Sequence, residues 1–152
     1  MKRFSTYLAL AVVGLGSLTN CKKDETTSLH RAATKTDVLT AKSWKVTDIK
    51  IADKSIFRTI LVDSCSKDDL TKFNANKSVT FEEGAFKCEE SSPQSRTGAW
   101  EFTTNETKLK VTDSDGSVLE EAISTLNTTT LIVTDPNFAG PGVAAEVIYT
   151  AQ

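Results

Sequence analysis

"TGAWEFTTNETKLKVT" (residues 97–112) contains two runs of alternating apolar and polar residues, with a polar break between them. The first run places three residues on one face: Gly98, Trp100 and Phe102. In the second run, Leu109 and Val111 alternate with lysines. Alternation of period two indicates half-buried β-strands, and the break at residues 105–106 predicts a two-residue hairpin turn. The segment therefore predicts an antiparallel hairpin with one apolar face.

Similar patterns on both sides of this hairpin predict further short strands. The predicted strands are residues 44–51, 55–62, 70–74, 78–83, 117–126, 128–136 and 143–150. Eight or nine short strands at even spacing, joined by tight turns, predict an all-β fold in the form of an antiparallel up-and-down meander. Such a sheet hides its edges best by closing into a small barrel of about eight strands.

Several local features of this prediction are specific. The apolar phase slips after Val46, so we expect a β-bulge near residues 47–48. Residues 55–62 are apolar enough for a well-buried strand, and residues 64–70 should form a turn or one 3₁₀ turn. Two residues are candidates to cap that turn: Ser66 and Asp68. Residues 84–90 either continue the preceding strand or pair back on it. In the last strand, four residues should face inward: Val143, Ala145, Val147 and Tyr149.

Three segments carry short structural motifs: "LTAKSWKV" (39–46), "CSKDDLTKFNANKSVTFEEG" (65–84) and "GAWEFTTNETKLKV" (98–111). Together they resemble the lipocalin-like domains of the calycin type, and the resemblance covers about residues 39 to 150. It implies a lipocalin-like β-barrel domain at residues 39–152, in which Trp44 plugs one end. It also implies that a Cys65–Cys88 bond ties neighbouring hairpins, and it implies no catalytic residue.

The first 20 residues have the pattern of a signal peptide. Two basic residues precede a stretch of 12 mostly apolar ones at 7–18, which is shorter than the roughly 20 that a membrane-spanning helix needs. The segment that ends in Cys21, "LTNC" (18–21), resembles a bacterial lipobox, in which the cysteine becomes the acylated first residue of the mature chain. The alternative is an ordinary signal peptide followed by an incidental cysteine.

Residues 21–38 contain few large apolar side chains, which predicts a flexible tether. Its "KDE" (23–25) resembles the export signal of surface-exposed lipoproteins in some Gram-negative bacteria, and a solvated spacer is the alternative. We therefore expect a lipid-anchored outer-membrane protein, and whether it faces the periplasm or the cell surface stays open.

The charge balance limits the partners of the mature chain. Without Lys2 and Arg3 the chain from Cys21 onward holds 16 basic and 20 acidic residues, a net charge of −4. Nucleic-acid binding calls for a basic stripe, so we expect no nucleic-acid partner. The length from residue 39 onward suits one domain, which we expect to be monomeric.

Cys65 and Cys88 remain when Cys21 is assigned to lipid, and in an exported protein such a pair predicts a disulfide. A metal site is the competing interpretation, but two cysteines and the single His30 in the tether do not supply four ligands. We expect neither a metal nor a cofactor.

The folded domain contains no histidine, which excludes Ser-His-Asp and Cys-His catalysis. Four acidic pairs occur, at 68–69, 82–83, 89–90 and 120–121. Neighbours on a strand point to opposite faces, so such pairs do not converge on one site. "DSDG" (113–116) lacks the later ligands of a calcium loop and predicts a turn. The chain is therefore predicted not to be an enzyme.

The remaining function is binding, and aromatic residues are the candidate contacts. The predicted ligand-binding residues are Trp44, Phe81, Trp100, Phe102 and Tyr149. They could instead only fill the barrel, because an eight-stranded interior holds either side chains or one small ligand. We expect a lipoprotein that binds a small hydrophobic or amphipathic molecule. The alternative is a non-enzymatic envelope module that binds a protein or glycan through its loops, as an inhibitor would.

Overall fold

The predicted hairpin forms the middle of the sheet. The computed structural model describes residues 31–152, of which 32–152 form one compact unit. Strands β5 (Ser95–Thr103) and β6 (Lys108–Thr112) pair antiparallel, with Trp100 opposite Val111 and Phe102 opposite Leu109. Their turn is longer than the two residues predicted: Thr104, Asn105 and Glu106 all have positive φ angles.

A glycine explains how closely these two strands approach. A Cβ on Gly98 would lie 2.4 Å from the carbonyl oxygen of Thr112, which belongs to the backbone and cannot move away at low cost. Gly98 therefore allows β5 and β6 to pack at this end of the hairpin.

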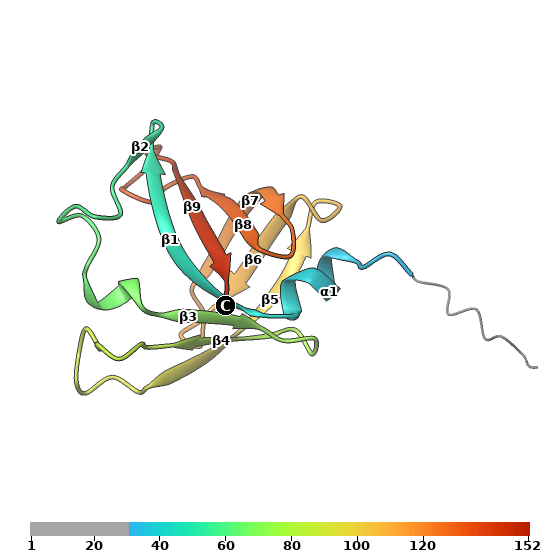
Figure 1. Cartoon of the computed structure of the whole chain (residues 1–152), viewed down its shortest axis with the longest axis horizontal. Coiled ribbons are helices and arrows are strands. Elements are labelled where there is room, and N and C mark those ends of the chain that lie inside the picture. The colour runs from blue at the N-terminus through green and yellow to red at the C-terminus, as the bar shows by residue number, and fades with distance from the viewer. Residues whose placement is uncertain (1–30) are drawn as a thin grey trace, which may run out of the picture. The chain divides into compact units, whose positions relative to one another are not determined.

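The other strands extend this hairpin into a closed sheet (Figure 1). They are β1 (Ser43–Ile51), β2 (Lys54–Ser55), β3 (Leu70–Phe73), β4 (Ser78–Glu82), β7 (Val118–Leu126), β8 (Thr130–Asp135) and β9 (Ala145–Ala151). Neighbours from β3 to β9 pair antiparallel in sequence order, and β1 pairs with both β3 and β9. The result is a closed antiparallel barrel of eight strands, with β2 as a short addition at the end of β1. The predicted fold class is confirmed.

The expected bulge in the first strand is also confirmed. The register of β1 against β9 shifts between Val46 and Asp48. This shift turns Ile49 into the interior, where it is buried together with Val147 of β9. The bulge adds one residue to β1, and the slip in the apolar pattern keeps the apolar side chains on the inner face on both sides of it.

Residues 55–62 do not form the buried strand that was predicted. Only Lys54–Ser55 pairs with β1, and the chain then turns, with the Thr59 amide donating to the Ile56 carbonyl at 2.9 Å. Ile60 is 98% exposed. The strand prediction fails because apolar composition reports burial and not backbone pairing: Ile56, Phe57 and Val62 pack on the core from turns. On this edge, β1 pairs only at residues 43–44 with β3 and at residues 50–51 with β2.

The segment that follows carries the disulfide. Cys65–Lys67 form a 3₁₀ turn (η1), as expected, and Cys65 is bonded to Cys88, which confirms the predicted bridge. Of the two predicted caps, Asp68 stands at the C-cap position of the turn, whereas the N-cap residue is Ser64, which makes no side-chain cap bond. Asp68 also accepts a hydrogen bond from the Ala85 amide at 2.6 Å, because the bridge brings the 83–94 loop beside it. Residues 84–90 belong to that loop and form no strand.

A short helix closes one end of the barrel. Helix α1 (Lys35–Thr40) begins with a capping box between Thr34 and Asp37. Leu39 of α1 is fully buried, and its carbonyl accepts a hydrogen bond from the Trp44 indole at 2.8 Å. The folded domain thus begins several residues before residue 39, inside the segment that we expected to be tether.

The two ends of the barrel differ in their coverage (Figure 1). At one end, α1 lies near the β3–β4 and β5–β6 turns, and Lys35 donates to the Glu106 carbonyl at 2.5 Å. We call this the closed end. The other end carries the longer connections, residues 52–69, 83–94, 113–117 and 136–144, and we call it the mouth. Val143, which was expected to face inward, is an exposed residue of the last of these loops.

Some predictions lie outside the described residues. They are the signal peptide at 1–20, acylation of Cys21, the position of His30 and the tether up to residue 30. Within residues 31–152, no helix is both long enough and apolar enough to cross a membrane.

Candidate functional site

A cavity of about 320 Å³ lies inside the barrel. Its walls come from all the barrel strands except β1, because the alternation of each strand turns every second side chain inward. Most of these side chains are apolar, including Phe73, Phe81, Leu109, Val111, Leu131 and Val133. Ligand sites in proteins are typically concave, largely apolar and about 300–1,000 Å³ in volume, so this cavity is of ligand size.

A second cavity of about 240 Å³ lies beside the first, under the loop that follows β2. Phe57 and Val62 of that loop cover it, and Val46 and Ile49 of β1 form its floor. The two cavities share four wall residues: Thr71, Phe81, Arg96 and Tyr149. Phe57 and Val62, which the sequence assigned to a buried strand, therefore line this second cavity.

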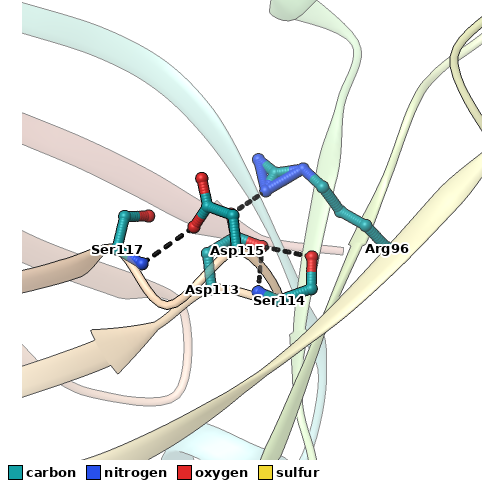
Figure 2. Close-up of polar contacts among 5 residues, drawn as sticks. All are labelled: Arg96, Asp113, Ser114, Asp115 and Ser117. Atoms are coloured by element: carbon teal, nitrogen blue, oxygen red, sulfur yellow. Dashed lines mark hydrogen bonds and ion pairs between the residues drawn. The ribbon is translucent and has the colours of Figure 1, made fainter.

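An ion pair stands where the two cavities meet the mouth (Figure 2). Arg96 of β5 donates to Asp113, which opens the β6–β7 turn. Asp113 also accepts from the backbone amide of Ser114 at 2.6 Å. Burial acts to raise the pKa of Asp113, but the hydrogen bonds from Ser114 and Arg96 outweigh it and hold that pKa below its usual value. The Arg96 guanidinium also lies 4.3 Å from the centroid of the Phe81 ring.

Glu121 is the polar residue deepest in the wall. It lies on β7 opposite Leu109 and is only 5% exposed, and it lines the larger cavity. Among the residues that the structure describes, no group donates a hydrogen bond to its carboxyl. Burial raises its pKa to about 7, and the negative charge of Asp135 on β8 adds to this effect.

Asp135 and Tyr149 complete the polar surroundings of Glu121. The register that pairs Ala122 with Thr134 places Glu121 beside Asp135 on the inner face. Burial raises the pKa of the Tyr149 hydroxyl, and the charges of Glu121 and Asp135 raise it further. The Tyr149 hydroxyl faces the cavities and has no hydrogen-bond partner in residues 31–152.

The structure separates the five predicted ligand-binding residues. Phe81 and Tyr149 line both cavities. Trp44 lies at the closed end against α1, as the resemblance implied, and lines neither cavity. Trp100 packs edge-on against Phe73 and Phe102, at ring-centroid distances of 5.7 and 5.3 Å. Trp100 also borders a depression on the outer side of β5 and β6, where Lys77 lies over its ring.

The cavity residues that the sequence did not single out are mainly Arg96, Asp113, Glu121, Leu131 and Val133. One signal could have found Glu121. In residues 117–126 it has the same strand phase as Leu119 and Ile123, so it is an acid within an inward apolar series. We expected the 120–121 pair to split between two faces, and it does: Glu120 is exposed and bonds Lys108 at 2.9 Å.

The other acidic pair with a defined role is Asp68–Asp69, which holds the 83–94 loop. Asp69 accepts a hydrogen bond from the Gly84 amide at 3.1 Å. Burial raises the pKa of Asp69, although the Gly84 bond opposes it. A Cβ on Gly84 would lie 2.1 Å from the Asp68 carboxyl carbon, so a larger residue there would displace the Asp68 side chain. In residues 31–152 no cluster of three or more His, Cys, Asp or Glu side chains is arranged to hold a metal.

A small closed barrel with a ligand-sized interior cavity defines a class of binding protein rather than one activity. The sequence model of the lipocalin-like domain family matches residues 40–133, which is more than half of the chain. The chain therefore belongs to the lipocalin-like domain family. No curated protein matches it.

Proposed function

We propose that the barrel binds one small amphipathic molecule in its interior and performs no chemistry on it. The observation that carries this proposal is the cavity of about 320 Å³, which combines apolar walls with the unpartnered polar groups of Glu121 and Tyr149. An apolar wall favours burial of a hydrocarbon part, and the polar groups fix its orientation.

The test is titration with the neutral fluorescent probe N-phenyl-1-naphthylamine. We expect saturable binding at one site, with an increase in fluorescence as the probe leaves water. Val133→Phe should weaken this binding at least about tenfold, because Val133 lines the cavity and the larger ring occupies it.

The matched control is Ile132→Phe, which enlarges the neighbouring side chain on the outward face of β8. Circular dichroism verifies that both variants are folded. Equal affinity of the two variants, or probe binding that never saturates, would contradict an interior site.

We also propose that the protein is held at the outer membrane by acylation of Cys21. The "LTNC" segment and the short apolar stretch before it support this proposal. Cys21→Ser should move the protein from the membrane fraction to the soluble fraction, and mass spectrometry should find no acyl group on it. A Cys21→Ser protein that stays in the membrane fraction would refute the anchor.

A second candidate function is docking of a partner through the mouth. In residues 31–152 the exposed large hydrophobic side chains are Ile60, Leu61, Phe86, Val118, Leu119 and Val143, and all six lie on mouth loops or on the mouth end of β7. Exposed apolar patches of this kind mark interaction sites. Photo-crosslinking from position 61 in cells should give one discrete adduct that Phe86→Ser removes, whereas a diffuse pattern would contradict docking.

A further inference from the structure

Glu121 is the only charged residue that is buried in the part of the chain from 31 to 152, with 5% of its surface exposed. Its carboxyl lines the larger cavity and accepts no hydrogen bond from these residues. The Tyr149 hydroxyl lines the same cavity and is also without a partner there. Both groups open onto the cavity and have no partner in residues 31–152, so a ligand there meets one carboxyl and one phenol that are free to form hydrogen bonds with it.

The charge around the cavities indicates the sign of that ligand. Their walls contain five acidic residues and one basic residue, Arg96; the acidic ones are Asp69, Glu82, Glu83, Asp113 and Glu121. Arg96 is already paired with Asp113, and so it does not neutralise Glu121. Asp135 adds a further negative charge beside Glu121, while its own carboxylate accepts the Asn137 amide at 2.8 Å.

We propose that the bound molecule is a small amphiphile with a protonated amine, and that its ammonium group is held by Glu121 and Tyr149. This inference rests on the proposed function and adds the chemical class of the ligand. An ammonium group donates up to three hydrogen bonds, which suits a carboxylate and a phenol oxygen together. The hydrocarbon part lies against Leu131, Val133 and Phe81, which surround the two polar groups.

Two other occupants are less consistent with the site. A hard metal ion prefers six or more oxygen ligands, and no metal-ligating cluster is found in residues 31–152. Ordered water alone could bond both groups, but water does not use the apolar walls. Both become outcomes of the experiment.

The experiment is isothermal titration of the purified protein with octylamine, octan-1-ol and octanoate at pH 7.5. These probes share one chain and differ in the head group. We expect octylamine to bind at least about tenfold more tightly than octan-1-ol, since a charge-assisted hydrogen bond is about twice as strong as a neutral one. Glu121→Gln should remove this preference, so that octylamine and octan-1-ol bind the variant with similar affinity.

The matched control is Glu120→Gln, which removes the neighbouring outward carboxylate and should keep the preference for the amine. Proton linkage supplies a second measurement. The pKa of Glu121 is about 7, so its ionised fraction increases about tenfold between pH 6 and pH 8, and the affinity for octylamine should increase by a similar factor. The titratable or charged groups that lie beside Glu121 or share its cavity are Asp135, Tyr149, Arg96 and Asp113.

The outcomes separate this inference from the proposed function. If the three probes bind equally, the cavity binds ligands but the amine assignment is wrong. If none of them binds, the proposed function fails as well. If calcium, magnesium or zinc competes with octylamine, the site is a metal site. If Glu121→Gln leaves the affinity for octylamine unchanged, only water bonds Glu121 and Tyr149. Each of these results overturns the inference.

Discussion

Glu121 weakens the fold at neutral pH. Its ordinary pKa of 4.5 applies to the unfolded chain, and burial raises the folded value to about 7. The folded state therefore holds the proton more tightly, and the free energy of unfolding decreases as the pH rises from the lower to the higher value. When no ligand compensates its charge, ionised Glu121 therefore destabilises the folded state.

We predict that Glu121→Gln flattens this dependence. Between pH 5 and pH 8 the wild-type free energy of unfolding should decrease by about 2–3 kcal/mol more than that of the variant, because glutamine does not ionise. Urea unfolding at several pH values measures the difference. Glu120→Gln should keep the wild-type slope, since that carboxylate is exposed and its pKa is lowered by hydrogen bonds from Lys108 and Thr103. Parallel slopes for the wild type and Glu121→Gln would contradict the burial argument.

At the scale of elements, the disulfide joins the two loops that cover the mouth. It connects the 52–69 and 83–94 segments, and Asp68 and Asp69 add hydrogen bonds between them. These loops have few strand contacts of their own, so the bridge supplies much of their order. We predict that Cys65→Ser/Cys88→Ser lowers the free energy of unfolding by about 3 kcal/mol, the entropy expected for a closed loop of this size.

Denaturant unfolding measures this loss, and wild-type protein in a reducing buffer should show the same loss as the double variant. The closed end supplies the internal comparison, because the bridge lies among the mouth loops and α1 lies at the opposite end. Amide hydrogen exchange at Trp44 that occurs through local opening, and not through global unfolding, should therefore keep its rate in the double variant. A larger increase of the exchange rate at Trp44 than in the mouth loops would contradict a local effect of the bridge.

The elements that could be predicted are those in which one face alone determines the pattern. β5, β6 and β9 alternate cleanly because one side meets the core and the other meets water. Residues 55–62 were predicted wrongly because apolar composition reports burial and not hydrogen bonding. Three apolar residues of this segment pack on the core, Ile56, Phe57 and Val62, and of these only Ile56 bonds the backbone of β1, through its amide and the Ile49 carbonyl.

The site could be predicted only in part, for a related reason. Phe81 and Tyr149 were predicted as ligand contacts because they are aromatic, and they do line the cavity. Trp44 and Trp100 are aromatic too, but they pack in the core. Whether an inward aromatic residue meets a cavity depends on its height along the barrel, which follows from strand register across the whole sheet. In the sequence, Glu121 is one member of an adjacent acidic pair, which predicted a solvated position. Its neighbour in space, Asp135, lies on β8, and only the pairing of β7 with β8 brings the two residues together.

At the scale of the whole molecule, closure depends on the last strand. β9 pairs with β8 on one side and with β1 on the other, and it contributes the buried Ala145 and Val147. We predict that a chain ending at residue 144 is insoluble or unfolded, because two open sheet edges and part of the core become exposed at once. Removal of Gln152 alone should leave the circular dichroism spectrum unchanged, and a folded, soluble 144-residue form would show that closure is dispensable.

The position of α1 also determines how the protein can be handled. The chain enters the barrel through α1 at the closed end, and it leaves there too, since Ala151 lies opposite Trp44. The described chain therefore begins and ends at the closed end of the barrel, opposite the mouth. An N-terminal linkage to a bilayer, a bead or a biosensor chip leaves the mouth accessible, and so does a C-terminal tag. The mouth and the cavities behind it stay away from either point of linkage.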